Sequence, residues 1–210
     1  MEQLHQEINS MKANEDAFKS LLRQQPFYEV STSDSQILFG NPDAAMMITI
    51  LTNPFCNPCA KMHTRVEHML RETKGEVCFQ YIFSAFDESL LYANRYLIAA
   101  YLTPPSIAKS HHSPHSAKLE GTSLERQREV ICQLYNDWFT KGKEIEEEFF
   151  SGLQLDMTNP AIEIEFQKHQ AWKEKTQLHA TPTILINGYK LPESYKIEDL
   201  RYLSEFDFEI

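Results

Sequence analysis

The sequence predicts an α/β fold in which a central sheet is flanked by helices. Two short apolar runs, residues 46–51 and 77–83, contain the β-branched and aromatic residues typical of buried strands. Between them, apolar residues recur at helical spacing over residues 62–70, which completes the strand, helix, strand order of a parallel crossover unit. Near the end of the chain, Asn187-Gly188 separates two further apolar runs and predicts a β-hairpin.

The first part of the chain contributes fewer elements. Apolar residues recur at interrupted helical spacing over residues 2–23, a stripe that ends before Pro26 and indicates a helix or linker. A short strand is expected at residues 37–40, and a turn at residues 41–43. Gly75 is the expected end of the helix that follows residue 56.

The second part of the chain is mostly helical. Four segments have helical patterns, and they are residues 88–102, 123–139, 144–150 and 160–175. Ser123 and Asn159 are the expected caps of two of them, while residues 106–122 read as a surface loop. Apolar residues at helical spacing over 197–206 indicate a closing helix. We therefore divide the chain into an N-terminal helix or linker, residues 1–34, and a domain, residues 35–210, with a helical insertion at about residues 88–176.

Composition excludes several classes of function. The formal net charge is −10, with 20 Lys and Arg against 30 Asp and Glu, so no basic surface favours binding to nucleic acid. No stretch approaches the roughly 18 apolar residues that a membrane helix needs, so we expect no membrane insertion. Four cysteines in 210 residues are too few for a disulfide-stapled scaffold.

The strongest chemical signal is the segment Cys56-Asn57-Pro58-Cys59, which lies between a predicted buried strand and an amphipathic helix. At the start of a helix, unpaired backbone N–H groups and the helix dipole stabilise a thiolate at Cys56. Cys59 lies one turn further along the same face and can reach back to it. Pro58 fits the first helical turn, where its missing N–H would have no partner. The pattern predicts a reactive dithiol.

A zinc site is the alternative chemistry of this motif, because His63 completes a Cys-x-x-Cys-x-x-x-His pattern. A structural zinc ion needs four ligands, and Cys78 and Cys132 lie in separate apolar elements, where we expect inert buried thiols. The histidines of residues 111–115 are interpreted as part of a solvated loop. Trp138 and Trp172 are interpreted as core residues, and we expect no metal and no cofactor.

Three segments carry a resemblance to a known family: residues 39–44, the Cys56-Asn57-Pro58-Cys59 motif, and residues 180–183 (Ala-Thr-Pro-Thr). Together they resemble the thioredoxin superfamily, in particular its DsbA-like and DsbG-like branch. More narrowly, residues 52–63 and 181–192 are similar to the thioredoxin-like domain fused to bacterial vitamin K epoxide reductase homologues. The likeness covers most of residues 35–206.

The resemblance implies a thioredoxin fold: a central mixed sheet flanked by helices, with the helical insertion between the βαβ half and the C-terminal hairpin and helix. It assigns Cys56 as the attacking thiol, Cys59 as the buried resolving thiol, and Thr181-Pro182 as a cis-proline pair that faces the sulfurs and binds an extended substrate peptide. This chain departs from the family pattern at Ile50, which stands where the family usually has a buried acid, six residues before the first cysteine.

The expected function is therefore thiol-disulfide exchange with cysteine-containing proteins of the cell envelope. The resemblance implies a periplasmic domain of a larger membrane protein, coupled to a quinone-linked partner like vitamin K epoxide reductase; a cytoplasmic location stays open. Since Asn57 and Pro58 stand between the cysteines, the redox direction cannot be carried over from DsbA. The alternative function is a thioredoxin-fold module that binds proteins, as a chaperone does, without redox turnover.

Overall fold

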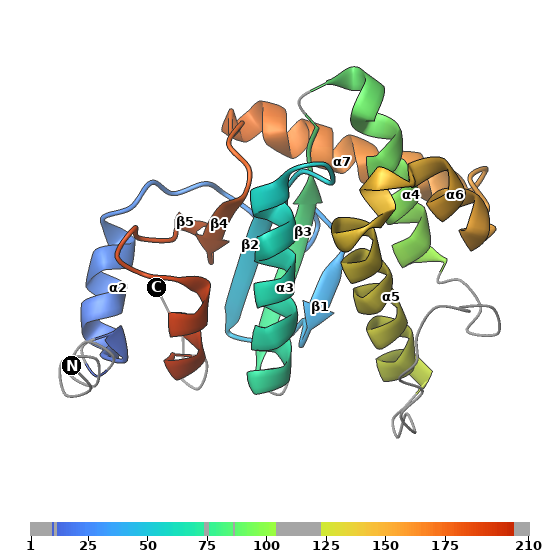
Figure 1. The fold of residues 1–210 in the computed structure, drawn as a ribbon. Coiled ribbons are helices and arrows are strands. Elements are labelled where there is room, and N and C mark those ends of the chain that lie inside the picture. The colour runs from blue at the N-terminus through green and yellow to red at the C-terminus, as the bar shows by residue number, and fades with distance from the viewer. Residues whose placement is uncertain (1–9, 11, 74–75, 86, 104–122, 204–210) are drawn as a thin grey trace.

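The core of the molecule is a five-stranded mixed sheet with the strand order β1-β3-β2-β4-β5. The computed structural model describes residues 10, 12–73, 76–85, 87–103 and 123–203. The strands are β1 (Leu38–Gly40), β2 (Met46–Thr52), β3 (Val77–Phe83), β4 (Thr183–Ile186) and β5 (Tyr189–Lys190). β2 and β3 pair in parallel, and the other three pairings are antiparallel. This confirms the predicted α/β fold with a mixed sheet (Figure 1).

The crossover from β2 to β3 is the helix α3 (Asn57–Glu72). Its buried side chains recur at helical spacing and are Cys59, Met62, His63, Val66 and Met69. They pack in the main core with Ile48 and Ile50 of β2. Alternation along a strand places these two side chains, and that of Thr52, on the sheet face covered by α3. Since β2 ends at Thr52 and α3 begins at Asn57, the start of the helix lies close to the end of the central strand.

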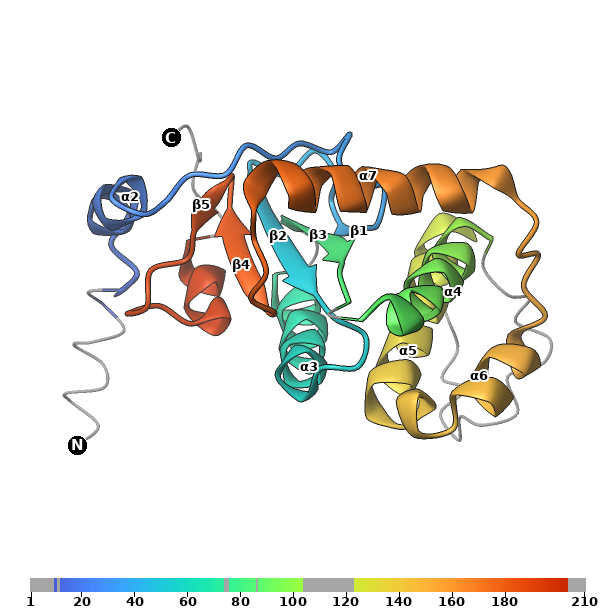
Figure 2. The same ribbon diagram turned by 90° about the horizontal axis from the view of Figure 1, so that it is seen from above.

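The opposite face of the sheet is covered by α7 (Pro160–Thr176) (Figure 2). Asn159 caps this helix, as predicted, by accepting a hydrogen bond from the Ala161 N–H at 3.0 Å. Trp172 of α7 forms a small apolar cluster with Leu51, Ile82 and Leu185, which point away from α3. Trp172 is thus a core residue, as the sequence predicts.

The helical insertion lies beyond the β1 and β3 side of the sheet (Figure 2). Its helices there are α4 (Leu91–Leu102), α5 (Ser123–Thr140) and α6 (Glu146–Leu153), whereas α7, which falls within the predicted insertion of about residues 88–176, lies across the sheet. Short 3-10 turns, Glu88–Leu90 and Gly142–Glu144, precede α4 and α6, so α6 starts two residues later than predicted. The predicted loop of residues 106–122 and the side chain of the predicted cap Ser123 lie outside the described part of the structure.

The C-terminal hairpin turns at Asn187 and Gly188, as predicted. Both residues have positive φ, 46° and 91°, the combination that a two-residue hairpin turn requires. The Asn187 side chain also accepts a hydrogen bond from the Met47 N–H at 2.7 Å, which ties the turn to β2. A Cβ at Gly188 would stand 2.8 Å from the Tyr28 carbonyl oxygen, so only glycine fits there.

The two ends of the described chain differ in detail from the prediction. The N-terminal helix α2 (Glu15–Arg23) forms the last part of the predicted stripe and is capped by Asn14, while residues 2–9 of that stripe lie outside the described residues. The closing helix is a 3-10 helix, Ile197–Tyr202. Thr73 follows the last residue of α3, whereas Gly75 and Phe206 lie outside the described residues. Within those residues, no helix is both long and apolar enough to cross a bilayer.

Candidate active site

Cys56 is the N-cap residue of α3, at the tip of the helix. Its backbone is extended, with φ −82° and ψ 125°, and its sulfur accepts a hydrogen bond from the Cys59 N–H at 3.3 Å. Pro58 lies in the first turn, where no N–H is needed. The side chain of Cys56 is partly exposed. The sulfur therefore lies at a helix N-terminus, as the sequence predicts, and the structure adds that it is partly open to solvent.

Cys59 lies beneath Cys56 and is 1% exposed. Its sulfur accepts a hydrogen bond from the Asn53 N–H at 3.4 Å. Burial and, to a smaller extent, a hydrogen bond to the Cys56 side chain together raise the pKa of the Cys59 thiol to about 11. The two cysteines are therefore chemically different: one sulfur is accessible at the helix tip, and the other is a buried thiol in contact with it.

The Thr181-Pro182 segment faces Cys56 from the other half of the fold. The peptide bond between these residues is cis. The Cys56 thiol donates to the Thr181 carbonyl oxygen at 3.6 Å, across 125 residues of sequence. The structure thus brings together the four residues that the sequence placed in two distant segments.

The helical insertion also reaches this site, which the sequence did not predict. Trp138 was interpreted only as a core residue; it is fully buried, but its indole N–H also donates to the Pro54 carbonyl oxygen at 3.1 Å. The Phe55 ring packs edge-on against Trp138, with ring centroids 5.6 Å apart. From the same insertion, Lys143 donates to the side-chain oxygen of Asn57. Contacts from the insertion therefore hold the loop that leads into Cys56.

The remaining two cysteines lie elsewhere. No disulfide joins any of the four cysteines, all of which are described. Cys78 is buried on β3, next to Phe79 and therefore on the sheet face away from α3. Cys132 is on α5, and burial raises the pKa of its thiol to about 12. Cys78 lacks solvent access, and Cys132, which is partly exposed rather than buried as expected, lies in the middle of its helix instead of at a helix N-terminus.

His63 is enclosed by aromatic rings rather than exposed on its helix. Its Nδ1 atom lies 2.7 Å from the Tyr81 hydroxyl, and burial lowers the pKa of its imidazole to about 4. Across the described residues, no group of three His, Cys, Asp or Glu side chains is arranged to hold a metal ion. The histidines of residues 111–115 lie outside the described part of the chain.

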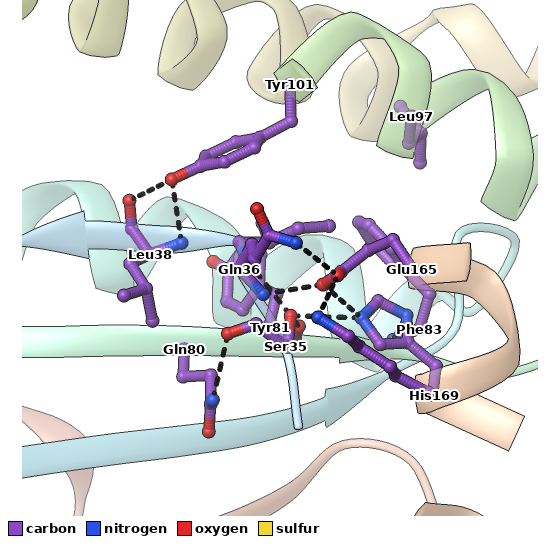
Figure 3. Close-up of polar contacts among 12 residues, drawn as sticks. Ser35, Gln36, Leu38, Gln80, Tyr81, Phe83, Leu97, Tyr101, Glu165 and His169 are labelled. Atoms are coloured by element: carbon purple, nitrogen blue, oxygen red, sulfur yellow. Dashed lines mark hydrogen bonds and ion pairs between the residues drawn. The ribbon is translucent and has the colours of Figure 1, made fainter. Parts of the chain in front are cut away.

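A second polar cluster connects α7, β3 and the segment before β1 (Figure 3). The Phe83 N–H donates to His169 Nδ1 at 3.2 Å, so the proton of the neutral ring is on Nε2, which lies 2.9 Å from the Ser35 hydroxyl and 3.4 Å from Glu165. Glu165 also accepts a hydrogen bond from the Gln36 N–H at 2.5 Å. A hydrolytic triad needs the acid and the serine on opposite ring nitrogens, whereas here both face the same one. All three side chains are fully buried, so the cluster is structural.

Comparisons with known proteins agree with this architecture. The structure is similar to BdbD from Bacillus subtilis in its oxidised form, with a TM-score of 0.58, 12% identity, and coverage of 86% of this chain and 96% of that one. It is also similar to ScsC from Proteus mirabilis in a compact conformation (TM-score 0.57, 14% identity, coverage 97% and 88%). The thiol-disulfide exchange protein alpha-DsbA2 from Wolbachia pipientis is similar too (TM-score 0.56, 10% identity, coverage 94% and 96%).

At these identities the similarity shows the fold. No curated protein sequence matches this chain. A family model described as thioredoxin does match, over residues 32–203, which include both cysteines of the motif, the cis-proline segment and the whole sheet. With that match and with the mixed sheet already described, the chain belongs to the thioredoxin family.

Proposed function

We propose that this chain is a thiol-disulfide oxidoreductase that exchanges disulfides with cysteine-containing proteins through Cys56 and Cys59. The observation that carries the proposal is the arrangement of the two sulfurs. Cys56 is partly exposed at the tip of α3, between the Cys59 N–H and the Thr181 carbonyl, and the Cys59 thiol is buried against it. Disulfide exchange needs an accessible thiolate and a second thiol within reach, and this arrangement supplies both.

In the reductive direction, the Cys56 thiolate attacks one sulfur of a substrate disulfide. A bond forms between Cys56 and that sulfur, the substrate S–S bond breaks, and the other substrate sulfur leaves with the electron pair and takes up a proton. Cys59 then attacks the Cys56 sulfur. The Cys56–Cys59 disulfide forms, the second substrate sulfur leaves as a thiolate that takes up the proton of Cys59, and the substrate is reduced. Oxidation of a substrate is the same sequence in reverse.

Substrate docking is proposed at the Thr181-Pro182 segment. It faces Cys56, precedes β4 and presents backbone rather than charged side chains toward the sulfur. An extended peptide can add to such a segment as a strand, with backbone hydrogen bonds that do not depend on its sequence. This mode of binding suits an enzyme that accepts many protein substrates.

For cellular context we propose the cell envelope, with a membrane partner like vitamin K epoxide reductase that exchanges electrons with the dithiol. The support is the similarity of residues 52–63 and 181–192 to the thioredoxin-like domains fused to such reductases. These two segments hold the cysteines and the cis-proline pair, which are the residues that such a partner would contact.

The test is a redox equilibrium of the purified chain in mixtures of reduced and oxidised glutathione, read by mass spectrometry after thiol alkylation. We expect a single two-electron transition confined to the peptide that carries Cys56 and Cys59. Its midpoint should lie in the range of thioredoxin-fold proteins, from about −270 to about −120 mV, and should give the direction of the reaction. A variant with both Cys78 and Cys132 replaced by Ser should give the same curve. Two independent one-thiol transitions would refute the proposed function.

A further inference from the structure

Cys59 needs help from its surroundings to act as a nucleophile. Burial raises the pKa of its thiol to about 11, so the thiolate that must attack Cys56 in the second step is strongly disfavoured at neutral pH. Ile50, on the face of β2 that α3 covers, is apolar and 1% exposed, so it supplies no acid. The polar groups that favour the Cys59 thiolate must therefore come from elsewhere.

Two threonine side chains from different elements favour the Cys59 thiolate. Thr52 is the last residue of β2, is 3% exposed, and points toward α3 because it is in phase with Ile48 and Ile50. The hydrogen bond from the Asn53 N–H and the nearby Thr181 and Thr52 side chains lower the pKa of Cys59 and partly offset burial. The Thr181 hydroxyl oxygen is buried and has no hydrogen-bond partner among the described residues.

The backbone holds Thr52 firmly in this position. Thr52 pairs with Phe83 in the parallel register of β2 and β3, and its carbonyl oxygen accepts a hydrogen bond from the Ser84 N–H at 2.7 Å. The next residue, Asn53, donates its N–H to the Cys59 sulfur. The end of β2 thus places the Thr52 side chain on the face covered by α3, directly before the residue whose N–H donates to the Cys59 sulfur.

We propose that Thr52 is a positioning residue for the resolving step, whose hydroxyl donates a hydrogen bond to the Cys59 sulfur as it becomes a thiolate. In that step the Cys59 sulfur bonds to the Cys56 sulfur, the bond from Cys56 to the substrate sulfur breaks, and the leaving sulfur receives the electron pair and the Cys59 proton. A hydrogen bond to a sulfur that is gaining charge stabilises the transition state more than the neutral thiol. The inference rests on the dithiol function proposed above.

The test separates the two steps in a single turnover with oxidised glutathione, followed by rapid acid quench and mass spectrometry. In Thr52→Val, the glutathione adduct on Cys56 should form at the rate of the parent and resolve roughly tenfold more slowly, so that it accumulates. The rate of resolution should reach half its maximum at a higher pH than in the parent. Thr52→Ser, which keeps the hydroxyl, should restore both the rate and the pH profile.

The matched control is Thr49→Val, the same change on the same strand, where the Thr49 hydroxyl donates to Gln80 on the face away from α3. It should leave the rate and pH profile of resolution unchanged. Thr52→Ala removes the hydroxyl without adding a second methyl group, so it should slow resolution as Thr52→Val does and shows that the effect is not due to altered packing. The inference is wrong if Thr52→Val or Thr52→Ala resolves the adduct at the parental rate and pH, or if Thr52→Ser is as slow as Thr52→Val. Absence of any adduct on Cys56 in the parent protein would instead refute the proposed function.

Discussion

Replacement of Cys56 by Ser is expected to reduce catalysed insulin reduction, with dithiothreitol as the electron donor, to the rate of dithiothreitol alone. The physical reason is that a serine hydroxyl stays protonated at neutral pH and cannot form the sulfur–sulfur bond on which exchange depends. Cys59 cannot replace it, because its thiol is 1% exposed and has a pKa raised to about 11. The loss should therefore be complete.

Cys132→Ser is the matched control for this experiment. Cys132 is another thiol that is not fully buried, but it is on α5, away from the tip of α3. We expect this variant to keep the parental rate of insulin reduction, together with the parental far-ultraviolet circular dichroism. If Cys56→Ser retained a substantial part of the activity, or if Cys132→Ser lost it, the assignment of the attacking thiol would be wrong.

Replacement of Glu165 by Leu is expected to cost about 3 kcal/mol or more of unfolding free energy, because it breaks a buried charged network and leaves the Gln36 N–H without an acceptor. For a chain of this length, that corresponds to a fall in Tm of about 6 to 12 °C. Glu163→Leu on the same helix is the control. Glu163 pairs with Arg95 at the surface, its side chain is 51% exposed, and its loss should cost no more than about 1 kcal/mol.

The contribution of Glu165 to the free energy of unfolding should also depend on pH. Burial opposes the charge of this carboxylate, but hydrogen bonds from His169, Gln36 and Lys168 outweigh it and lower the pKa from 4.5 to about 2. A lowered carboxyl pKa stabilises the folded state above pH 4.5, and this contribution is lost as the pH falls toward 2. Urea unfolding should therefore show a difference between the parent and Glu165→Leu that is constant near neutral pH and shrinks below pH 4.5. A difference that grew in acid would contradict the network as described.

The hairpin and the strand, helix, strand crossover could be predicted because each depends on local sequence. Asn187 and Gly188 tolerate positive φ, and apolar residues along β2, α3 and β3 follow the period of each element, so the hairpin and the crossover could be derived from the chain. The position of Cys56 at the helix tip followed from the same boundary. The 3-10 geometry of Ile197–Tyr202 did not, because apolar spacing over two turns does not distinguish the two kinds of helix.

The parts of the site that depend on distant contacts could not be derived from the sequence. Trp138 lies 84 positions from Pro54, and its place in an apolar helical stripe is explained equally well by core packing. The partners Ser35 and His169 are 134 positions apart. Thr52 carried no signal of its own, since a threonine at the end of a strand is common; only the folded sheet shows that it lies on the face covered by α3, the helix that carries Cys59.

The measurement that tests the central claim most directly is covalent trapping with Cys59→Ala. The oxidised parent should form an internal Cys56–Cys59 disulfide, whereas Cys59→Ala, mixed with a disulfide-containing protein such as insulin, should remain linked to it. Peptide mass mapping should place that link on Cys56, and dithiothreitol should release it. The account predicts a stable adduct in Cys59→Ala, a transient one in the parent and none in a variant that also carries Cys56→Ser. An adduct on Cys78 or Cys132, or capture of insulin that persists after Cys56 and Cys59 are both replaced, would contradict it.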